Sequence, residues 1–402
     1  MRPAGEDIPL SRPALGEREE ELLLEAFRSG RLSLGPMQER FERLFASWLG
    51  VDDAVAVSSG TAGLHLGVRA LGWGEGDEVV TSPFSFVSSA NCLLYERARP
   101  VFCDVDPFTL NLDPAAAGSA VTERTAGVLA VHILGWPAAM RELEALAARY
   151  GLGFLEDACE AIGATDSDGR RVGRRGNAAT FGFYPNKQMT TGEGGMLVPP
   201  GPREASLYRS ERNQGRAPGT EAIEHQRLGF NYRLSELACA LGIAQVERLD
   251  ELLAARAAVA AAYAEQLEPL QARHGEGEEG LLVPVAGRGD ERRSWFVYVV
   301  QLPVGADRQA VIEALAGQGI PSKPYLPCLH LFPHLQALGY RQVIEHLQGK
   351  RPLAETVELV KIRTGQFAKR QMTWFRRQLQ LTWINLEPQS SAEAVVESIA
   401  RL

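Results

Sequence analysis

The chain has 402 residues, of which 45% are hydrophobic and 23% are charged, and its 40 glycines and 23 prolines are spread along the length. This composition is ordinary for a globular protein, excludes a disordered, collagenous or coiled-coil chain, and leaves room for at least two packed domains. A formal net charge of −8 at pH 7 argues against a chain-wide surface for nucleic acid or anionic membrane.

The spacing of the cysteines and the composition of the amino terminus indicate the cellular compartment of the protein. Cys92, Cys103, Cys159, Cys239 and Cys328 are widely spaced and include no CxxC pair, which is typical of reduced thiols and predicts neither a disulfide framework nor a metal site. The first residues carry acids where a secretory signal has its apolar core, and no run of about 18 apolar residues occurs. We therefore expect a cytoplasmic protein without a membrane segment.

Between residues 51 and 198, short runs rich in β-formers alternate with segments of helical spacing. The pattern predicts strands at residues 54–59, 78–87, 99–105, 127–134, 153–157, 179–184 and 194–198, and helices at 61–72, 88–96 and 138–151. Such alternation is typical of an α/β fold with a mostly parallel sheet covered by helices on both faces. Ligands of these folds bind beyond the carboxyl ends of the strands, so we expect the site there.

The second half of the chain predicts a lid and a smaller domain. Residues 203–232 are polar and irregular and are interpreted as an active-site loop, whereas 233–267 have the apolar spacing of one long helix or two joined helices. After a Gly/Glu-rich break at 274–280, a strand at 294–302 and a helix at 306–319 open an α+β unit. We expect a large domain at 1–245, a small domain at 246–340 and a tail at 341–402.

Three predicted strand ends carry polar groups that could do chemistry. Ser59-Gly60-Thr61-Ala62 turns from a strand into a helix, Asp157 closes GFLED, and Lys187 follows an aromatic strand in FGFYPNKQMTTGEGG. Backbone amides and hydroxyls at such a turn can hold a phosphate at the positive end of the helix. The motifs GxxxxGK[ST] and HExxH are absent, so nucleotide hydrolysis and zinc peptidase chemistry lose their usual signals.

Taken singly, each feature also has a plain structural explanation. Ser59 can be a helix cap, Asp157 another cap or a surface acid, Lys187 a solvated side chain, and Phe86 in SPFSFVSS a core aromatic. Together they meet the needs of pyridoxal phosphate, which requires a phosphate cradle, a carboxylate for the ring nitrogen, a flat side chain against the ring and a lysine for the Schiff base.

The chain resembles the DegT/DnrJ/StrS family of sugar aminotransferases. The motifs that carry this resemblance are IPLSRPALG, VSSGTAGLHL, FLEDACEAIGA, FGFYPNKQMTTGEGGML, LGFNYRLSELACALGIAQVERL and PYLPCLHLFPHLQALGYR. They are spread over most of the chain in the order that the family has them. The resemblance implies the fold-type-I architecture of pyridoxal-phosphate-dependent transferases, with a large mostly parallel sheet domain and a smaller α+β C-terminal domain, in a homodimer.

The same resemblance implies roles for single residues. Lys187 matches the Schiff-base lysine, Asp157 the acid paired with the pyridine nitrogen, and Glu160 the position near the phenolic oxygen. The remaining cofactor positions are the phosphate turn with Ser59, Gly60, Thr61 and Ala62, the ring-stacking Phe86, and Asn231, which in the family reaches the phosphate from the neighbouring subunit. Tyr325 and His330 match a loop that lines the substrate cleft.

The implied activity is transfer of an amino group from an amino acid donor, glutamate by expectation, to a keto group of a nucleotide-linked sugar. Family members that dehydrate sugars replace the lysine with histidine, so Lys187 favours transamination over the alternative of a sugar dehydratase. At Gly182 some members have a serine whose hydroxyl contacts the phosphate, and this chain lacks that contact.

The tail departs from the family. From about residue 337 it resembles the end of tRNA dimethylallyltransferases, with AKRQ at 368–371 and TWFR at 373–376. Residues 341–402 hold 10 basic and 6 acidic residues, net +4, which leaves −12 for residues 1–340. The tail could be a fusion, an artefact that leaves an inactive chimera, or a regulatory or RNA-binding segment. We favour a solvated helix face and expect no nucleic-acid partner.

Overall fold

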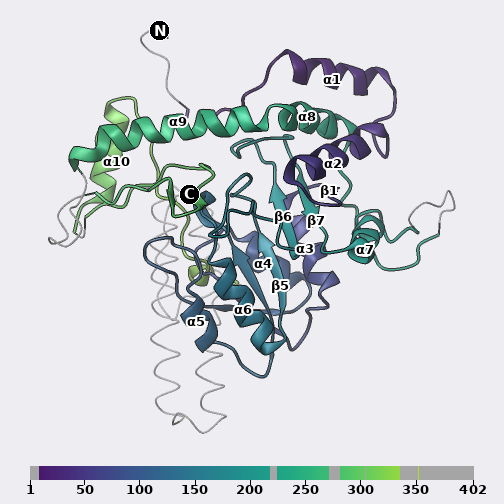
Figure 1. The fold of residues 1–402 in the computed structure, drawn as a ribbon, viewed down its shortest axis with the longest axis horizontal. Coiled ribbons are helices and arrows are strands. Elements are labelled where there is room, and N and C mark those ends of the chain that lie inside the picture. Colours follow the sequence, from purple (N-terminus) through teal and green to yellow (C-terminus); the bar gives the residue numbers. More distant parts are fainter. Residues whose placement is uncertain (1–8, 218–223, 271–280, 304, 336–351, 353–402) are drawn as a thin grey trace, which may run out of the picture. The chain divides into compact units, whose positions relative to one another are not determined.

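The computed structural model describes residues 9–217, 224–270, 281–303, 305–335 and 352 (Figure 1). The chain divides into two compact units, Met1–His330 and Leu331–Leu402, and the features below lie in the first. The tail at 341–402 lies outside the described residues, apart from Pro352, and so does the break at 274–280. The domain boundaries expected from the sequence stay predictions.

A seven-stranded sheet forms the centre of the first unit. Its strands are β1 (Val55–Val57), β2 (Glu78–Thr81), β3 (Arg99–Phe102), β4 (Thr125–Val131), β5 (Gly153–Asp157), β6 (Ala178–Gly182) and β7 (Gly195–Val198). They lie in the order β1-β7-β6-β5-β4-β2-β3, and only β7 runs antiparallel to its neighbours β1 and β6. The predicted α/β fold with a mostly parallel sheet is confirmed.

Helices cover both faces of this sheet because successive strand residues point to opposite sides. In β4, Leu129 joins a core cluster with residues of α3 (Gly60–Ala70) and α4 (Ser88–Tyr95). The next residue, Ala130, joins a second cluster with residues of α5 (Pro114–Ser119) and α6 (Met140–Tyr150). Both faces of β4 are buried, as expected for a parallel sheet between helical layers.

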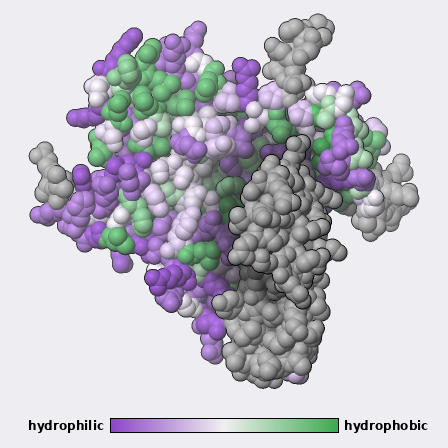
Figure 2. All heavy atoms as spheres, turned by 180° about the vertical axis from the view of Figure 1, so that it is seen from behind, coloured by the Kyte–Doolittle hydropathy of each residue, from purple (hydrophilic) through white to green (hydrophobic). Residues whose placement is uncertain are grey.

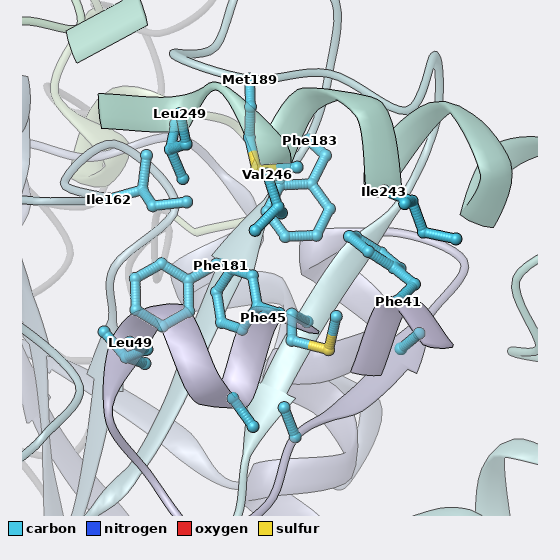
Figure 3. Packing of buried hydrophobic residues seen from close by; sticks show 14 of the residues in the cluster. Phe41, Phe45, Leu49, Ile162, Phe181, Phe183, Met189, Ile243, Val246 and Leu249 are labelled. Atoms are coloured by element: carbon cyan, nitrogen blue, oxygen red, sulfur yellow. The ribbon is translucent and has the colours of Figure 1, made fainter. Parts of the chain in front are cut away.

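Further helices pack on β6, on the sheet face that α5 and α6 also cover. Figure 3 shows Phe41 and Phe45 of α2 (Pro36–Leu49) facing Phe181 and Phe183. The rings of Phe45 and Phe181 meet edge to face with their centroids 5.4 Å apart. The same cluster takes in residues of α1 (Glu17–Arg28) and α8 (Glu236–Glu247), so the amino-terminal helices are fixed to the sheet domain.

The helical prediction for 233–267 is confirmed in its two-helix form. Ser235 caps α8 by accepting a hydrogen bond from the Ala238 amide, and α9 (Leu249–Leu267) begins after Arg248, whose φ of −124° interrupts the helix. A short 3₁₀ turn, η2 (Glu268–Leu270), follows. Within the described residues, no helix combines the length and the apolarity that crossing a membrane requires.

The prediction of an irregular loop over 203–232 is wrong for its first third, where α7 (Pro202–Arg212) forms. The polar sequence does not look helical because two of its charged side chains, Glu211 and Arg212, are buried in ion pairs with other helices. Arg212 pairs with Glu42 of α2, and Glu211 accepts from Arg69 of α3 at 2.8 Å. Residues 213–217 and 224–232 are irregular, as expected.

The prediction of a strand at 294–302 is also wrong. The segment is irregular and has no partner strand among the described residues, and only Gln301 forms an isolated bridge, to Leu282. The carbonyl groups of Trp295 and Phe296 instead accept from the Arg256 side chain of α9. The predicted helix at 306–319 is confirmed as α10 (Arg308–Gly317), and the remaining elements are β8 (Gly287–Arg288), β9 (Glu291–Arg292), η1 (Ile133–Gly135) and η3 (Leu329–Leu331).

Candidate active site

The turn after β1 forms a helix cap and leaves amides free for a ligand. Ser59 Oγ accepts from the Ala62 amide at 3.1 Å, so the expected capping role is present. Thr61 Oγ1 lies 2.7 Å from Ser88 Oγ, which ties the turn to the start of α4. Because the first amides of a helix have no intrahelical acceptor, the start of α3 suits an anion.

Glycines let this turn lie directly against β6 and β7. A Cβ at Gly195 would stand 2.7 Å from the carbonyl carbon of Ser59, and one at Gly60 would stand 2.7 Å from Cys159 Sγ. At Gly182 a Cβ would meet the same sulfur at 3.3 Å. Cys159 therefore fills the space beside Gly182.

Asp157 is the last residue of β5 and is 6% exposed. Its Oδ2 accepts from Ser89 Oγ at 2.6 Å, and its Oδ1 accepts from the Cys159 amide at 3.1 Å. Ser89 Oγ lies 2.6 Å from Ser85 Oγ in turn. Two donors thus fix the carboxylate at the carboxyl end of a central strand, and Asp157 is neither a helix cap nor a surface acid.

Lys187 meets Glu160, which follows Asp157 by three residues in the chain. Lys187 Nζ lies 3.5 Å from Glu160 Oε1 and 4.0 Å from the centroid of the Phe296 ring, and the lysine side chain is only 14% exposed. Glu160 Oε1 also accepts from the Tyr325 hydroxyl at 2.7 Å, while its Oε2 accepts from the Leu134 amide at 2.9 Å. Lys187 is therefore not a solvated surface lysine.

Burial raises the pKa values of two side chains in this cluster, Tyr325 and Cys159. Burial first, and then the charge and hydrogen bond of Glu160, raise the pKa of Tyr325, so its phenol keeps its proton at neutral pH. Burial, followed by the charge of Asp157, raises the pKa of the Cys159 thiol. Cys159 accordingly stays a thiol and is not an anionic nucleophile.

Three residues expected in the site are exposed to solvent in the single chain. Phe86 is 57% exposed in the turn before α4, and His330 is exposed in η3, where the neighbouring Leu329 amide donates to the Pro83 carbonyl at 2.7 Å. Asn231 is also exposed, next to Tyr232, whose carbonyl accepts from Ser58 at 2.8 Å. Within the described residues, no side-chain hydrogen bond joins any of the three to Lys187, Asp157 or Glu160.

The sequence reasoning missed Ser85, Ser89 and Phe296. The run SPFSFVSS shows hydroxyl residues ahead of a helix, and this spacing was the available signal for the two serines. Phe296 carried no signal, because it stood inside an expected strand more than 100 residues from the lysine that it contacts.

The residues present fit pyridoxal phosphate. The capped start of α3 offers amides to a phosphate, Asp157 offers a fixed carboxylate to a ring nitrogen, and Lys187 offers a shielded amine to an aldehyde. With a mostly parallel sheet beneath it, this set defines a fold-type-I transferase that depends on pyridoxal phosphate.

The particular family follows from comparison. The chain belongs to the DegT/DnrJ/EryC1/StrS aminotransferase family, whose model matches residues 13–359, and it is a pyridoxal-phosphate-dependent aminotransferase. The family part of the sequence prediction is confirmed. The resemblance of the tail to tRNA dimethylallyltransferases is not among these findings.

Two named proteins and one solved structure are similar to this chain. It is 36% identical over 349 residues to the spore coat polysaccharide biosynthesis protein SpsC of Bacillus subtilis, covering 83% of this chain and 87% of SpsC. It is 37% identical over 329 residues to GDP-perosamine synthase of Caulobacter vibrioides, covering 81% and 86%. The solved structure of NtdA from Bacillus subtilis with bound cofactor PMP is similar, with a TM-score of 0.71, 27% identity and coverage of 80% and 73%.

Proposed function

We propose that the protein moves an amino group from an amino acid, L-glutamate by preference, to a keto group of a nucleotide-linked sugar. The observations that carry the proposal are the shielded Lys187 amine, 3.5 Å from Glu160, and the fixed carboxylate of Asp157. The names of the relatives, GDP-perosamine synthase and a spore coat polysaccharide biosynthesis protein, support a sugar acceptor.

Bound pyridoxal phosphate would supply an electron sink that stabilises negative charge on the carbon bearing the amino group. In our proposal Asp157, held by Ser89 and the Cys159 amide, keeps the ring nitrogen protonated. The amides of Gly60 and Thr61 and the Ser59 hydroxyl hold the phosphate, the Ala62 amide keeps that hydroxyl in place by donating to its oxygen, and Phe86 covers the ring. Lys187 Nζ binds the aldehyde carbon of the cofactor. When it is free, this amine would carry a proton between the carbon that bears the amino group and that aldehyde carbon.

We propose that the active enzyme is a homodimer with shared sites. Phe86 and Asn231 are exposed in the single chain, which leaves them available to a second copy. Apolar side chains on and after α1 are exposed as well, with Phe27 at 66% and Leu32 at 50%. Figure 2 shows hydrophobic residues gathered at the upper left, on the side where α1 lies. Asn231 would reach the phosphate held by the neighbouring subunit.

For the substrate side we propose His330 as a contact for the sugar nucleotide, because its imidazole is exposed in the loop that follows Tyr325. We also propose a cytoplasmic location, which the widely spaced cysteines without a CxxC pair support.

We propose that the tail from about residue 337 shares its origin with tRNA dimethylallyltransferases. The family match extends to residue 359, so the two resemblances overlap around the tetrapeptide LGYR at 338–341. Reading the genomic DNA across codons 335–345 tests this: an uninterrupted frame supports a natural fusion, and a frameshift would identify an artefact.

The visible spectrum of the purified protein tests the activity. We expect a yellow chromophore that bleaches on addition of L-glutamate and returns when a keto sugar nucleotide is added. Lys187→Ala should lose both colour and turnover, because no amine remains to bind the cofactor. A protein that stays colourless with added pyridoxal phosphate, or a product that is dehydrated but not aminated, would overturn the proposal.

Mixing two inactive variants tests the shared site. Lys187→Ala and Asn231→Ala should each be inactive or strongly impaired, and refolding them together should restore part of the turnover, because one site of each mixed dimer keeps both residues. If the mixture has no more turnover than the two variants alone, Asn231 does not act across subunits.

A further inference from the structure

Glu160 stands between two groups that compete for one of its oxygens. Its Oε1 accepts from the Tyr325 hydroxyl at 2.7 Å and lies 3.5 Å from Lys187 Nζ. Its Oε2 is turned away and accepts from the Leu134 amide at 2.9 Å. The Leu134 contact fixes the carboxylate, so Oε1 is the oxygen that can serve the lysine.

Tyr325 is placed to serve Glu160. Its ring packs edge to face on Phe84, with the centroids 5.9 Å apart, and its hydroxyl is already committed to the carboxylate. Since the phenol keeps its proton, it donates to Glu160 throughout the neutral range. The sequence predicted Tyr325 as a substrate contact, whereas its hydroxyl here faces an acidic side chain of its own subunit.

We propose that Tyr325 is a positioning residue that acts on Lys187 through Glu160. By holding part of the hydrogen-bonding capacity of Oε1, Tyr325 weakens the ion pair between Glu160 and Lys187. The lysine ammonium is therefore kept beside the cofactor position but releases its proton more readily than it would beside an unshared carboxylate. The inference rests on the proposed function, in which Lys187 attacks the aldehyde of pyridoxal phosphate.

Other charged and titratable groups around the lysine are common to every variant considered below. Asp157 ends β5, and Cys159 and Glu160 follow it in the chain; the charges of Asp157, Lys187 and Glu160 all act on the Cys159 thiol. Arg256 of α9 donates from Nη2 to the Lys187 carbonyl at 2.8 Å, and the Phe296 ring faces the ammonium. None of these contacts involves the Tyr325 hydroxyl, so removing that hydroxyl isolates its effect on Glu160.

The rate at which cofactor binds covalently to the full-length apoprotein tests the proposal. Attack of the amine on the aldehyde forms a C=N bond and releases water, and only the neutral amine attacks, so the rate falls as pH falls. The appearance of the visible band after mixing with pyridoxal phosphate, measured across a range of pH, gives the pH of half-maximal rate.

Substitutions of Tyr325 and Glu160 should shift the pH of half-maximal rate in opposite directions. Tyr325→Phe leaves Glu160 wholly to the ammonium, so we expect an upward shift of about one pH unit, the size that follows from one hydrogen bond to a charged group. Glu160→Gln removes the counter-ion, so we expect a downward shift. In the Glu160→Gln background, Tyr325→Phe should add no further upward shift, because its action passes through the carboxylate.

Tyr150→Phe, which removes a hydroxyl from the exposed ring on α6, is the matched control and should leave the profile unchanged. A Tyr325→Phe profile equal to that of the wild type, or an equal shift with and without Glu160, would overturn the proposal. These results are distinct from failure of the proposed function, in which the wild-type protein itself would form no visible band.

Discussion

A backbone contact between Gly135 and Ser294 joins the loop ahead of α6 to the segment beyond α9. Gly135 has a φ of +79°, and a Cβ there would stand 1.6 Å from the carbonyl oxygen of Ser294. The Ser294 amide donates to the Gly135 carbonyl at 2.9 Å, so the two backbones touch. This contact brings the 294–296 segment, with Phe296, against the loop that carries Leu134 and its hydrogen bond to Glu160.

At the residue scale we predict that Gly135→Ala is strongly destabilising. The new methyl group adds a backbone clash to the strain of a left-handed conformation, so the loss in free energy of unfolding should exceed about 3 kcal/mol. Denaturant unfolding measures it. Gly151→Ala is the matched control, with a φ of +65° and no atom within 4 Å of the new Cβ, and should lose only about 1–2 kcal/mol. Equal losses in the two variants would contradict the prediction.

Among the elements, α8 holds the start of α2. The carboxylate of Glu236, at the first residue of α8, accepts from the Met37 amide at 2.8 Å and from the Gln38 amide at 3.1 Å. Glu236 is 1% exposed, and the positive end of α2 balances its charge. A buried acid of one helix thereby satisfies the free amides of another.

We predict that Glu236→Ala lowers the free energy of unfolding by about 1.5–3 kcal/mol, because two buried amides lose a charged acceptor. Thermal or denaturant unfolding checks the loss. Glu251→Ala, which removes an exposed acid from α9, should leave the stability within about 0.5 kcal/mol of the wild type. A stable Glu236→Ala protein would mean that water or another group replaces the carboxylate.

At the scale of the whole first unit, its stability depends on acids that arginines hold ionised. For Asp53, Glu78 and Glu96, burial acts to raise the pKa, but hydrogen bonds and charges of neighbouring basic side chains outweigh it and lower the pKa. A lowered native pKa means that the unfolded chain binds more protons in acid. The stabilisation is complete above the unfolded values, near 3.8 for Asp and 4.5 for Glu, and is lost as pH falls through the native ones.

We therefore predict that acid destabilises the protein in part through Glu78, which accepts from Arg124 at 2.6 Å and from Thr122 at 2.7 Å. Glu78→Gln should flatten the fall of stability below about pH 4.5, measured as the denaturant midpoint against pH. Glu75→Gln, which removes an exposed ion pair with Arg97, serves as the control. An unchanged acid slope in Glu78→Gln would exclude this carboxylate as a source.

The strands and helices of the sheet domain could be predicted because their signals are local. Ser59, Asp157 and Lys187 each stand at or after the end of an apolar run, and β5 and β6, which precede Glu160 and Lys187, pair as parallel neighbours in the sheet. The error at 203–232 arose because Glu211 and Arg212 read as exposed polar residues, whereas arginine and glutamate partners from α2 and α3 bury them.

The sequence by itself determined the α/β alternation and the family, and it predicted the cofactor residues, since periodicity and motifs are properties of neighbouring residues. Only the tertiary structure decided that Glu160 faces both Lys187 and Tyr325, and that 294–302 is not a strand. The partners in these contacts lie far apart in the chain. Hydrogen bonds and ion pairs act over a few ångströms, so folding alone selects which distant groups share them.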